Sequence, residues 1–161
     1  MKDDLRAILG MDDLGLFMRG GCHVFAVTLV DQLPEEGYEI VCASVVSPLN
    51  PHNRVDAAHI LCHRDDFIVH APGVERWTLY AERTASGYRD RQPSIWGDAL
   101  CLMTTTSATE LFAPVSERWM YGPVNRWEHG LDADFVAEVR RRAVDYIGRN
   151  RDRLRLSIAE R

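Results

Sequence analysis

A pair of glycines followed by a helical repeat of apolar residues constrains this chain more than any other stretch. Gly20-Gly21 interrupts the preceding segment, and the residues after it place apolar side chains on one stripe at helical spacing. The stripe consists of Cys22, Phe25, Ala26, Leu29, Val30 and Leu33. The spacing therefore predicts a buried helix that begins at Cys22 and ends near Leu33-Pro34.

A cysteine at the first position of a helix has a chemical consequence. The positive end of the helix dipole and the unpaired amide N–H groups there favour the thiolate over the thiol. The thiolate is the reactive form of a cysteine nucleophile. Cys22 is therefore a candidate nucleophile, and the alternative left open is that Cys22 is a small thiol of the core without chemistry.

A histidine-bearing hairpin follows about forty residues later. Residues 57–63 and 66–70 are mostly apolar stretches around the polar corner Arg64-Asp65, which predicts two short antiparallel strands. A turn centred on that corner pairs His59 directly with His70. Both imidazoles then lie on the face opposite to the one that carries Ile60, Cys62, Phe67 and Val69. One ring can take a thiol proton while the other orients it.

These motifs resemble those of the papain-like cell-wall peptidases and amidases of bacteria. The resemblance covers roughly residues 19 to 75, with Gly21-Cys22 opening a helix, His59 opening a strand and His70 on the next strand. It implies Cys22 as the nucleophile, His59 as the base and His70 as the orienting residue. It also implies a papain-like fold, in which an antiparallel sheet packs against the helix of the catalytic cysteine.

The remaining segments predict an α+β domain that spans residues 1–161 as a single unit. Residues 107–130 have no clear period and receive no assignment. The other expected elements are a helix over Asp3–Leu9, a strand over Glu39–Val46, a strand over Glu75–Ala81, a loop over Arg83–Pro93, a buried strand over Ala99–Met103 and a C-terminal helix from Asp132.

Length and composition suit one self-sufficient core. The chain has 161 residues, of which 46% are apolar, so it needs neither a metal nor a disulfide to fold. The four cysteines are far apart and form no CxxC pair, which indicates reduced thiols. The N-terminus lacks a signal-like pattern, and no apolar run approaches a membrane span, so we expect a cytoplasmic protein, with non-classical export left open.

Charge is distributed unevenly along the chain. The net charge is −5, but residues 140–161 contain eight arginines against three acidic residues. The acidic remainder argues against a nucleic-acid-binding protein. The basic C-terminus is expected either to dock an acidic protein partner or to be a solvated helix face, with Arg140-Arg141-Arg142 facing water.

The predicted function is a thiol hydrolase or acyltransferase that acts on an amide, ester or thioester through Cys22, His59 and His70. A peptidase, an amidase or a deamidase would fit, with a peptide or another amide-containing substrate, without a cofactor or metal and without a membrane. Two alternatives stay open. Zinc binding would use Cys22-His23 and the His59/Cys62/His63 group, although Cys62 points away from those histidines in a strand. A noncatalytic interaction module of the same fold would use the basic C-terminus with Trp96, Trp119 and Trp127.

Overall fold

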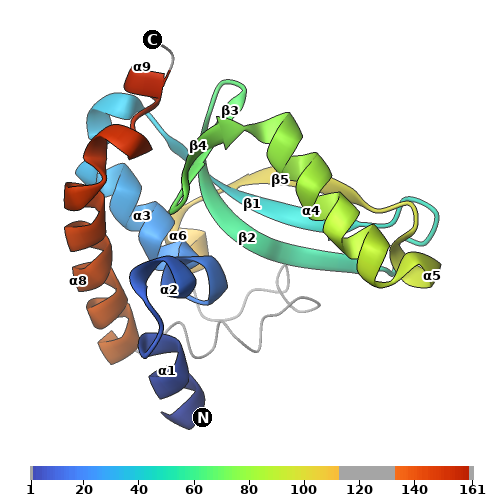
Figure 1. Cartoon of the computed structure of the whole chain (residues 1–161), viewed down its shortest axis with the longest axis horizontal. Helices are drawn as coiled ribbons and strands as arrows, with labels where there is room; N and C mark the ends of the chain where they lie inside the picture. Colours follow the sequence, from blue (N-terminus) through green and yellow to red (C-terminus); the bar gives the residue numbers. More distant parts are fainter. Residues whose placement is uncertain (1, 113–132, 160–161) are drawn as a thin grey trace.

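The structure is a computed structural model, and it describes residues 2–112 and 133–159. The described part begins with helices, continues with consecutive strands, and ends with helices around one further strand (Figure 1). The helices are α1 (Lys2–Leu9), α2 (Asp13–Arg19), α3 (Cys22–Gln32), η1 (Pro34–Glu36), α4 (Trp77–Arg91), α5 (Pro93–Trp96), α6 (Ala108–Leu111), α8 (Ala133–Arg149), η4 (Arg151–Leu154) and α9 (Leu156–Ala159). The strands are β1 (Glu39–Val46), β2 (Arg54–Arg64), β3 (Phe67–His70), β4 (Gly73–Arg76) and β5 (Leu100–Thr106).

One antiparallel sheet organises the described residues. Its strand order is β4-β3-β2-β1-β5, and every described pairing is antiparallel. Helices α3 and α8 lie on one side of the sheet, and α4 crosses the other side (Figure 1). The α+β class, the helix that begins at Cys22 and the C-terminal helix are therefore present as the sequence predicts.

The larger core lies between the sheet and α2, α3 and α8. Ile40, Cys42, Ile60, Cys62 and Val69 contribute the sheet side of this core. On the helical side, the ring of Phe17 lies 4.8 Å from that of Phe25 and 5.3 Å from that of Tyr146. Because aromatic rings bury large apolar areas, this packing holds α3 firmly against the sheet.

The glycine before Cys22 is required by close packing. A Cβ at Gly21 would lie 2.8 Å from Cγ1 of Val139 on α8 and 3.3 Å from the carbonyl oxygen of Leu16. No larger side chain fits at this corner between α2 and α3 without moving α8. Gly21 therefore lets the first residue of α3, Cys22, sit against the rest of the domain.

The prediction of a strand over Glu75–Ala81 and a loop over Arg83–Pro93 is wrong. Strand β4 ends at Arg76, and a fifteen-residue helix, α4, follows directly. Trp77 and Tyr80, three residues apart as on one face of a helix, pack against the sheet residues Val41, Leu61 and Ile68. The two-residue alternation read over residues 75–81 covers too few residues to distinguish a strand from this amphipathic helix.

The prediction of a buried strand over Ala99–Met103 is also only partly right. Strand β5 runs from Leu100 to Thr106 and pairs with β1 at the edge of the described sheet. Leu100 and Leu102 are each 48% exposed, whereas Cys101 and Met103 pack toward the α4 side. An edge strand leaves alternate side chains uncovered, and a purely apolar run does not reveal this.

The C-terminal arginines bind carboxylates of this same chain. Arg142 does not face water as predicted: its side chain is only 15% exposed, and its Nε donates to Asp13 at 2.7 Å. Arg142 also donates to the carbonyl oxygens of Leu9 and Met11. Arg140 pairs with Asp31. An acidic protein partner for the basic C-terminus stays a prediction.

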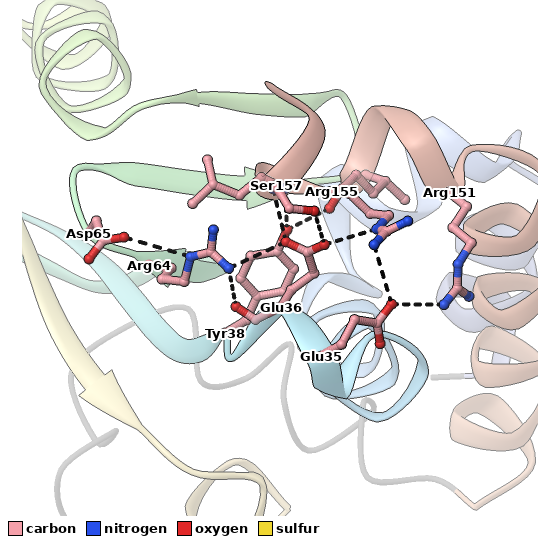
Figure 2. A network of polar contacts seen from close by, with 10 residues as sticks. Glu35, Glu36, Tyr38, Arg64, Asp65, Arg151, Arg155 and Ser157 are labelled. Carbon is pink, nitrogen blue, oxygen red and sulfur yellow. Dashed lines mark hydrogen bonds and ion pairs between the residues drawn. The ribbon is translucent and has the colours of Figure 1, made fainter. Parts of the chain in front are cut away.

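A buried carboxylate holds the last described segment in place. Glu36, whose side chain is 1% exposed, accepts hydrogen bonds from Nε of Arg155 at 2.9 Å and from the backbone N–H and hydroxyl of Ser157 (Figure 2). Arg64 of β2 completes the group from the other side. We call Glu36, Arg64, Arg155 and Ser157 the Glu36 network.

No single helix in residues 2–112 and 133–159 is long and apolar enough to cross a membrane. Helices α2 and α3 pass the same test of length and composition only as a pair, and they meet at 108°.

Candidate active site

The hairpin that carries the two histidines differs in register from the prediction. Its turn is centred on Asp65-Asp66 instead of Arg64-Asp65, so that Cys62 pairs with Val69 and Arg64 with Phe67. Asp65 has a positive φ of 55°, a conformation that aspartate tolerates. Arg64 stays in the strand, where its guanidinium binds the carbonyl oxygen of Glu36. The direct pairing of His59 with His70 is therefore wrong.

The two histidines nevertheless share one face of the sheet. A shift of two residues leaves every side chain on its original face, so His59 and His70 become diagonal neighbours. Their ring centroids lie 5.7 Å apart, and both residues are buried. The face they share is the one covered by α4, whose Tyr80 ring lies 5.6 Å from His70 and 6.5 Å from His59.

Cys22 lies at the edge of β2 near Ile60, the residue that follows His59. Strand β3 ends at His70, and its described pairs with β2 stop at Cys62, which leaves the edge of β2 near Ile60 without a paired strand. The thiol group of Cys22 lies close enough to interact with the backbone of Ile60. Helix α3 packs on one face of the sheet, and its first residue thus lies at the unpaired edge of β2.

Tyr80 connects Cys22 with the histidine side of the sheet. Burial raises the pKa of the Tyr80 phenol, and the charged forms of Cys101, Cys22 and Glu75 raise it further. Because charges act over short distances inside a protein, Cys101 and Cys22 both lie near the tyrosine that contacts the two imidazole rings. The two histidines therefore pack against Tyr80, which sequence reasoning did not include, and Cys22 lies in its neighbourhood.

The thiol of Cys22 is protonated at rest, contrary to the expectation from the helix dipole. Burial raises its pKa to about 11, although hydrogen bonding with the backbone at Ile60, His23 and Cys22 favours the thiolate. Desolvation of the charged form therefore outweighs the helix start. A nucleophile in this state needs a base that removes its proton during the reaction.

The two imidazoles are neutral at neutral pH. Burial, with a contribution from His70, lowers the pKa of His59 to about 3. Burial also lowers the pKa of His70, although the neighbouring Glu75 acts to raise it. A neutral imidazole has a free lone pair on one nitrogen, so either ring can accept a proton.

Glu75 and Arg83 complete the polar group around His70. Nε2 of His70 lies 2.9 Å from Oε1 of Glu75, and Arg83 on α4 donates to both oxygens of Glu75, at 2.8 and 2.7 Å. Glu75 pairs with Ile68 across the β3–β4 hairpin, which puts its side chain on the face of His70. The turn at Ala71-Pro72, which pairs His70 with Gly73, brings about this contact, and the Pro72-Gly73 pair was its sequence signal. We call His59, His70, Glu75 and Arg83 the histidine chain.

The residues considered for zinc are not brought together. Cys62 lies on the opposite face from His59, where its thiol contacts the carbonyl oxygen of Ala26. In the described parts of the chain, no three His, Cys, Asp or Glu side chains are placed to hold a metal ion.

The tryptophans considered for an interaction surface divide into two groups. Trp96 is buried against Val45 and Ala99. Trp119 and Trp127 lie outside the described residues.

No protein-family model matches this chain, and neither the curated proteins nor the solved structures contain a match to it.

Proposed function

We propose that this protein is a cysteine hydrolase or acyltransferase with a papain-like arrangement of Cys22, His59 and His70. One observation carries the proposal: a cysteine at a helix start lies at the unpaired edge of β2 near Ile60, the residue that follows one of two buried, neutral histidines. The substrate class is a peptide or another molecule with an amide, ester or thioester carbonyl. Peptidases, amidases and deamidases all belong to this class of reaction.

The high thiol pKa determines how the reaction starts. His59 takes the proton of the Cys22 thiol while the sulfur forms a bond to the substrate carbonyl carbon. The protonated His59 then gives that proton to the leaving nitrogen or oxygen as its bond to the carbonyl breaks. Water, activated by His59, attacks the resulting thioester, releases the acid and restores the thiol.

The start of α3 supplies candidate donors for the oxyanion. Gly21 is the N-cap residue of α3, and no side chain at this position accepts a hydrogen bond from the amide N–H groups of the first turn. These groups lie next to the attacking sulfur, where negative charge develops on the carbonyl oxygen.

Acylation of the protein tests this proposal, and Cys101 provides a matched control. Burial raises the pKa of Cys101 to about 11 as well, and this thiol is also half-buried. The purified protein is incubated with p-nitrophenyl acetate near pH 7.5, and peptide mass spectrometry locates the acetyl group. We expect acetylation of Cys22 to be about a hundredfold faster than that of Cys101, because the proposed base, His59, acts on Cys22.

The variant His59→Ala sharpens the test. It should slow acetylation of Cys22 by about tenfold or more and leave Cys101 unchanged. Equal rates at Cys22 and Cys101 in the wild-type protein, or an unchanged Cys22 rate in His59→Ala, would refute the proposal. Circular dichroism of the variant ensures that the folded proteins are compared.

A further inference from the structure

The hydrogen bond between Glu75 and His70 determines where the proton of His70 lies. Two hydrogen bonds from Arg83 lower the pKa of the Glu75 carboxyl, against burial, which acts to raise it. An ionised carboxylate only accepts hydrogen bonds. The contact of 2.9 Å between Oε1 of Glu75 and Nε2 of His70 therefore requires the hydrogen of His70 to be on Nε2.

The other nitrogen of His70 is consequently an acceptor. Because the ring is neutral, a hydrogen on Nε2 leaves a lone pair on Nδ1. This Nδ1 is buried and has no hydrogen-bond partner in the described residues. An acceptor sealed from water without a donor is unfavourable, so a donor close by would lower the free energy of the site.

His59 offers that donor. Its Nε2 is also buried without a partner among the described residues, and its ring centroid lies 5.7 Å from that of His70. The structure does not contain a hydrogen bond between these two atoms, but a rotation of the rings that directs a hydrogen on Nε2 of His59 to Nδ1 of His70 would satisfy both atoms at once. The neutral His59 then has its lone pair on Nδ1, which is the atom left to accept a proton from Cys22.

We propose that Glu75, held by Arg83, is a positioning residue that sets the tautomers of both His70 and His59. The order of donation runs from Nε2 of His59 to Nδ1 of His70, and from Nε2 of His70 to Glu75. The expected effect of Glu75 on Cys22 rests on the proposed function, whereas its expected effect on the two tautomers does not. Without the carboxylate, the two neighbouring imidazoles would adopt this order of donation and the opposite order with similar free energy.

The geometry separates Glu75 from the ordinary surface pairs of this protein. Glu82 pairs with Arg89 and Glu138 with Arg141, both at exposed positions. In the Glu75 pair, Oε1 accepts from Arg83 at 2.7 Å and also contacts the buried His70 ring. An exposed ion pair contributes little to stability, so the histidine is the feature that gives Glu75 a further role.

The tautomers can be observed directly in the full-length protein. Two-bond ¹⁵N–¹H correlation spectra of the histidine rings near pH 7.5 distinguish a hydrogen on Nδ1 from one on Nε2, and His59→Gln and His70→Gln variants assign the two signals. We expect both rings to carry their hydrogen on Nε2. In Glu75→Gln, whose amide can donate as well as accept, we expect at least one ring to lose this preference.

Glu82→Gln is the matched control, because it removes a carboxylate from an Arg pair on α4 without a contact to His70. It should leave both tautomers unchanged. A hydrogen on Nδ1 of His70 in the wild-type protein, or identical tautomers in wild type and Glu75→Gln, would overturn the proposal.

The acetylation rate of Cys22 connects the tautomers with the chemistry. Glu75→Gln should reduce this rate by about tenfold or more, since an imidazole in the wrong tautomer presents N–H to the thiol. Arg83→Gln should reduce it less, because Glu75 still contacts His70. If wild-type Cys22 reacts faster than Cys101, an unchanged rate in Glu75→Gln would refute a role of Glu75 in the reaction of Cys22.

The two proposals fail in different ways. If the tautomers depend on Glu75 but wild-type Cys22 reacts no faster than Cys101, the proposed function fails and the control of the tautomers by Glu75 stands. If Cys22 reacts rapidly in a way that depends on His59, and the tautomers are the same in wild type and Glu75→Gln, the proposed function stands and the role of Glu75 is overturned.

Discussion

Glu36 and Glu75 are both carboxylates that bind arginine, but the polar groups around them differ in how completely their hydrogen bonds are satisfied. Both oxygens of Glu36 have partners, with Arg155 and the hydroxyl of Ser157 on Oε1 and the backbone N–H of Ser157 and Arg64 on Oε2 (Figure 2). The Glu36 network is therefore complete and ties the C-terminal segment to the sheet.

The histidine chain is incomplete by comparison. It runs from the half-exposed Arg83 inward through Glu75 and His70, and among the described residues it ends in two buried ring nitrogens without partners. Buried polar atoms usually have partners, and exceptions need an explanation. The contrast indicates that the Glu36 network serves stability, and it agrees with the proposed role of the histidine chain in setting the tautomers of His59 and His70.

The largest expected effect concerns the Glu36 network. Glu36→Ala should lower the free energy of unfolding by about 3 kcal/mol, because it leaves Arg155, Arg64 and the Ser157 N–H without their acceptor. The neighbouring Glu35→Ala, at a position whose side chain is 43% exposed, should cost about 0.5 kcal/mol or less. Urea unfolding at pH 7 measures both. Similar losses for the two variants would contradict a specific structural role of Glu36.

As the pH falls, the two regions should lose their contributions to the free energy of unfolding in different pH ranges. The pKa of His59 is lower when folded, at about 3, than its ordinary 6.5, so the unfolded chain binds the proton first and stability falls as pH drops below 6.5. The loss from His59 should reach about 2 kcal/mol at pH 5.

The Glu36 network should respond at lower pH. Hydrogen bonds from Ser157 and Arg155 lower the pKa of Glu36 from 4.5, against the opposing effect of burial. Its stabilisation is thus present above pH 4.5 and is lost as pH falls through the folded-state pKa. Urea unfolding at pH 7, 5 and 4 checks this order. His59→Asn should flatten the change between pH 7 and 5, and an unchanged slope would mean that His59 is not buried in its neutral form.

A somewhat smaller effect is expected from Tyr38, next to the Glu36 network. Its hydroxyl donates to the carbonyl oxygen of Leu154 at 2.8 Å and accepts from the N–H of Leu156 at 2.8 Å. Tyr38→Phe should lower the free energy of unfolding by about 1.5 kcal/mol, because both backbone groups are buried. Tyr88→Phe on α4 is the control, and equal changes in thermal midpoint would argue against the bridge.

The smallest expected effect on stability comes from the histidine chain. Glu75→Gln should lower the free energy of unfolding by about 0.5 kcal/mol, since Arg83 is largely exposed and can be solvated. The same variant is expected to change the histidine tautomers and the reactivity of Cys22. A loss as large as that of Glu36→Ala would place Glu75 among the structural residues and remove the contrast between the two regions.

Part of this fold could be predicted from local sequence patterns. The apolar stripe from Cys22 to Leu33 predicted α3, and Phe135 to Ile147 predicted α8, because helical periodicity depends only on nearby residues. Residues 77–91 were misread, since the apolar positions of α4 are few and its inward face depends on the sheet beneath it.

Which residues form the candidate site could partly be predicted from the sequence, but their register and contacts could not. That His59 and His70 share a face followed from strand alternation, which a two-residue register error leaves intact. The register itself depended on which aspartate adopts the positive φ, and Arg64 is held in the strand by the distant Glu36. Glu75 escaped notice because its contact with His70 depends on the tight hairpin at Pro72-Gly73.

The sequence alone determined that Cys22 opens a helix and that two histidines occupy one face of neighbouring strands, since both follow from short-range periodicity and from the glycines. Only the tertiary structure decided the protonation of that cysteine, the partners of the C-terminal arginines and the attachment of His70 to Glu75. These properties depend on burial and on groups distant in the chain, and a pKa or an ion pair is a property of the surroundings that folding assembles.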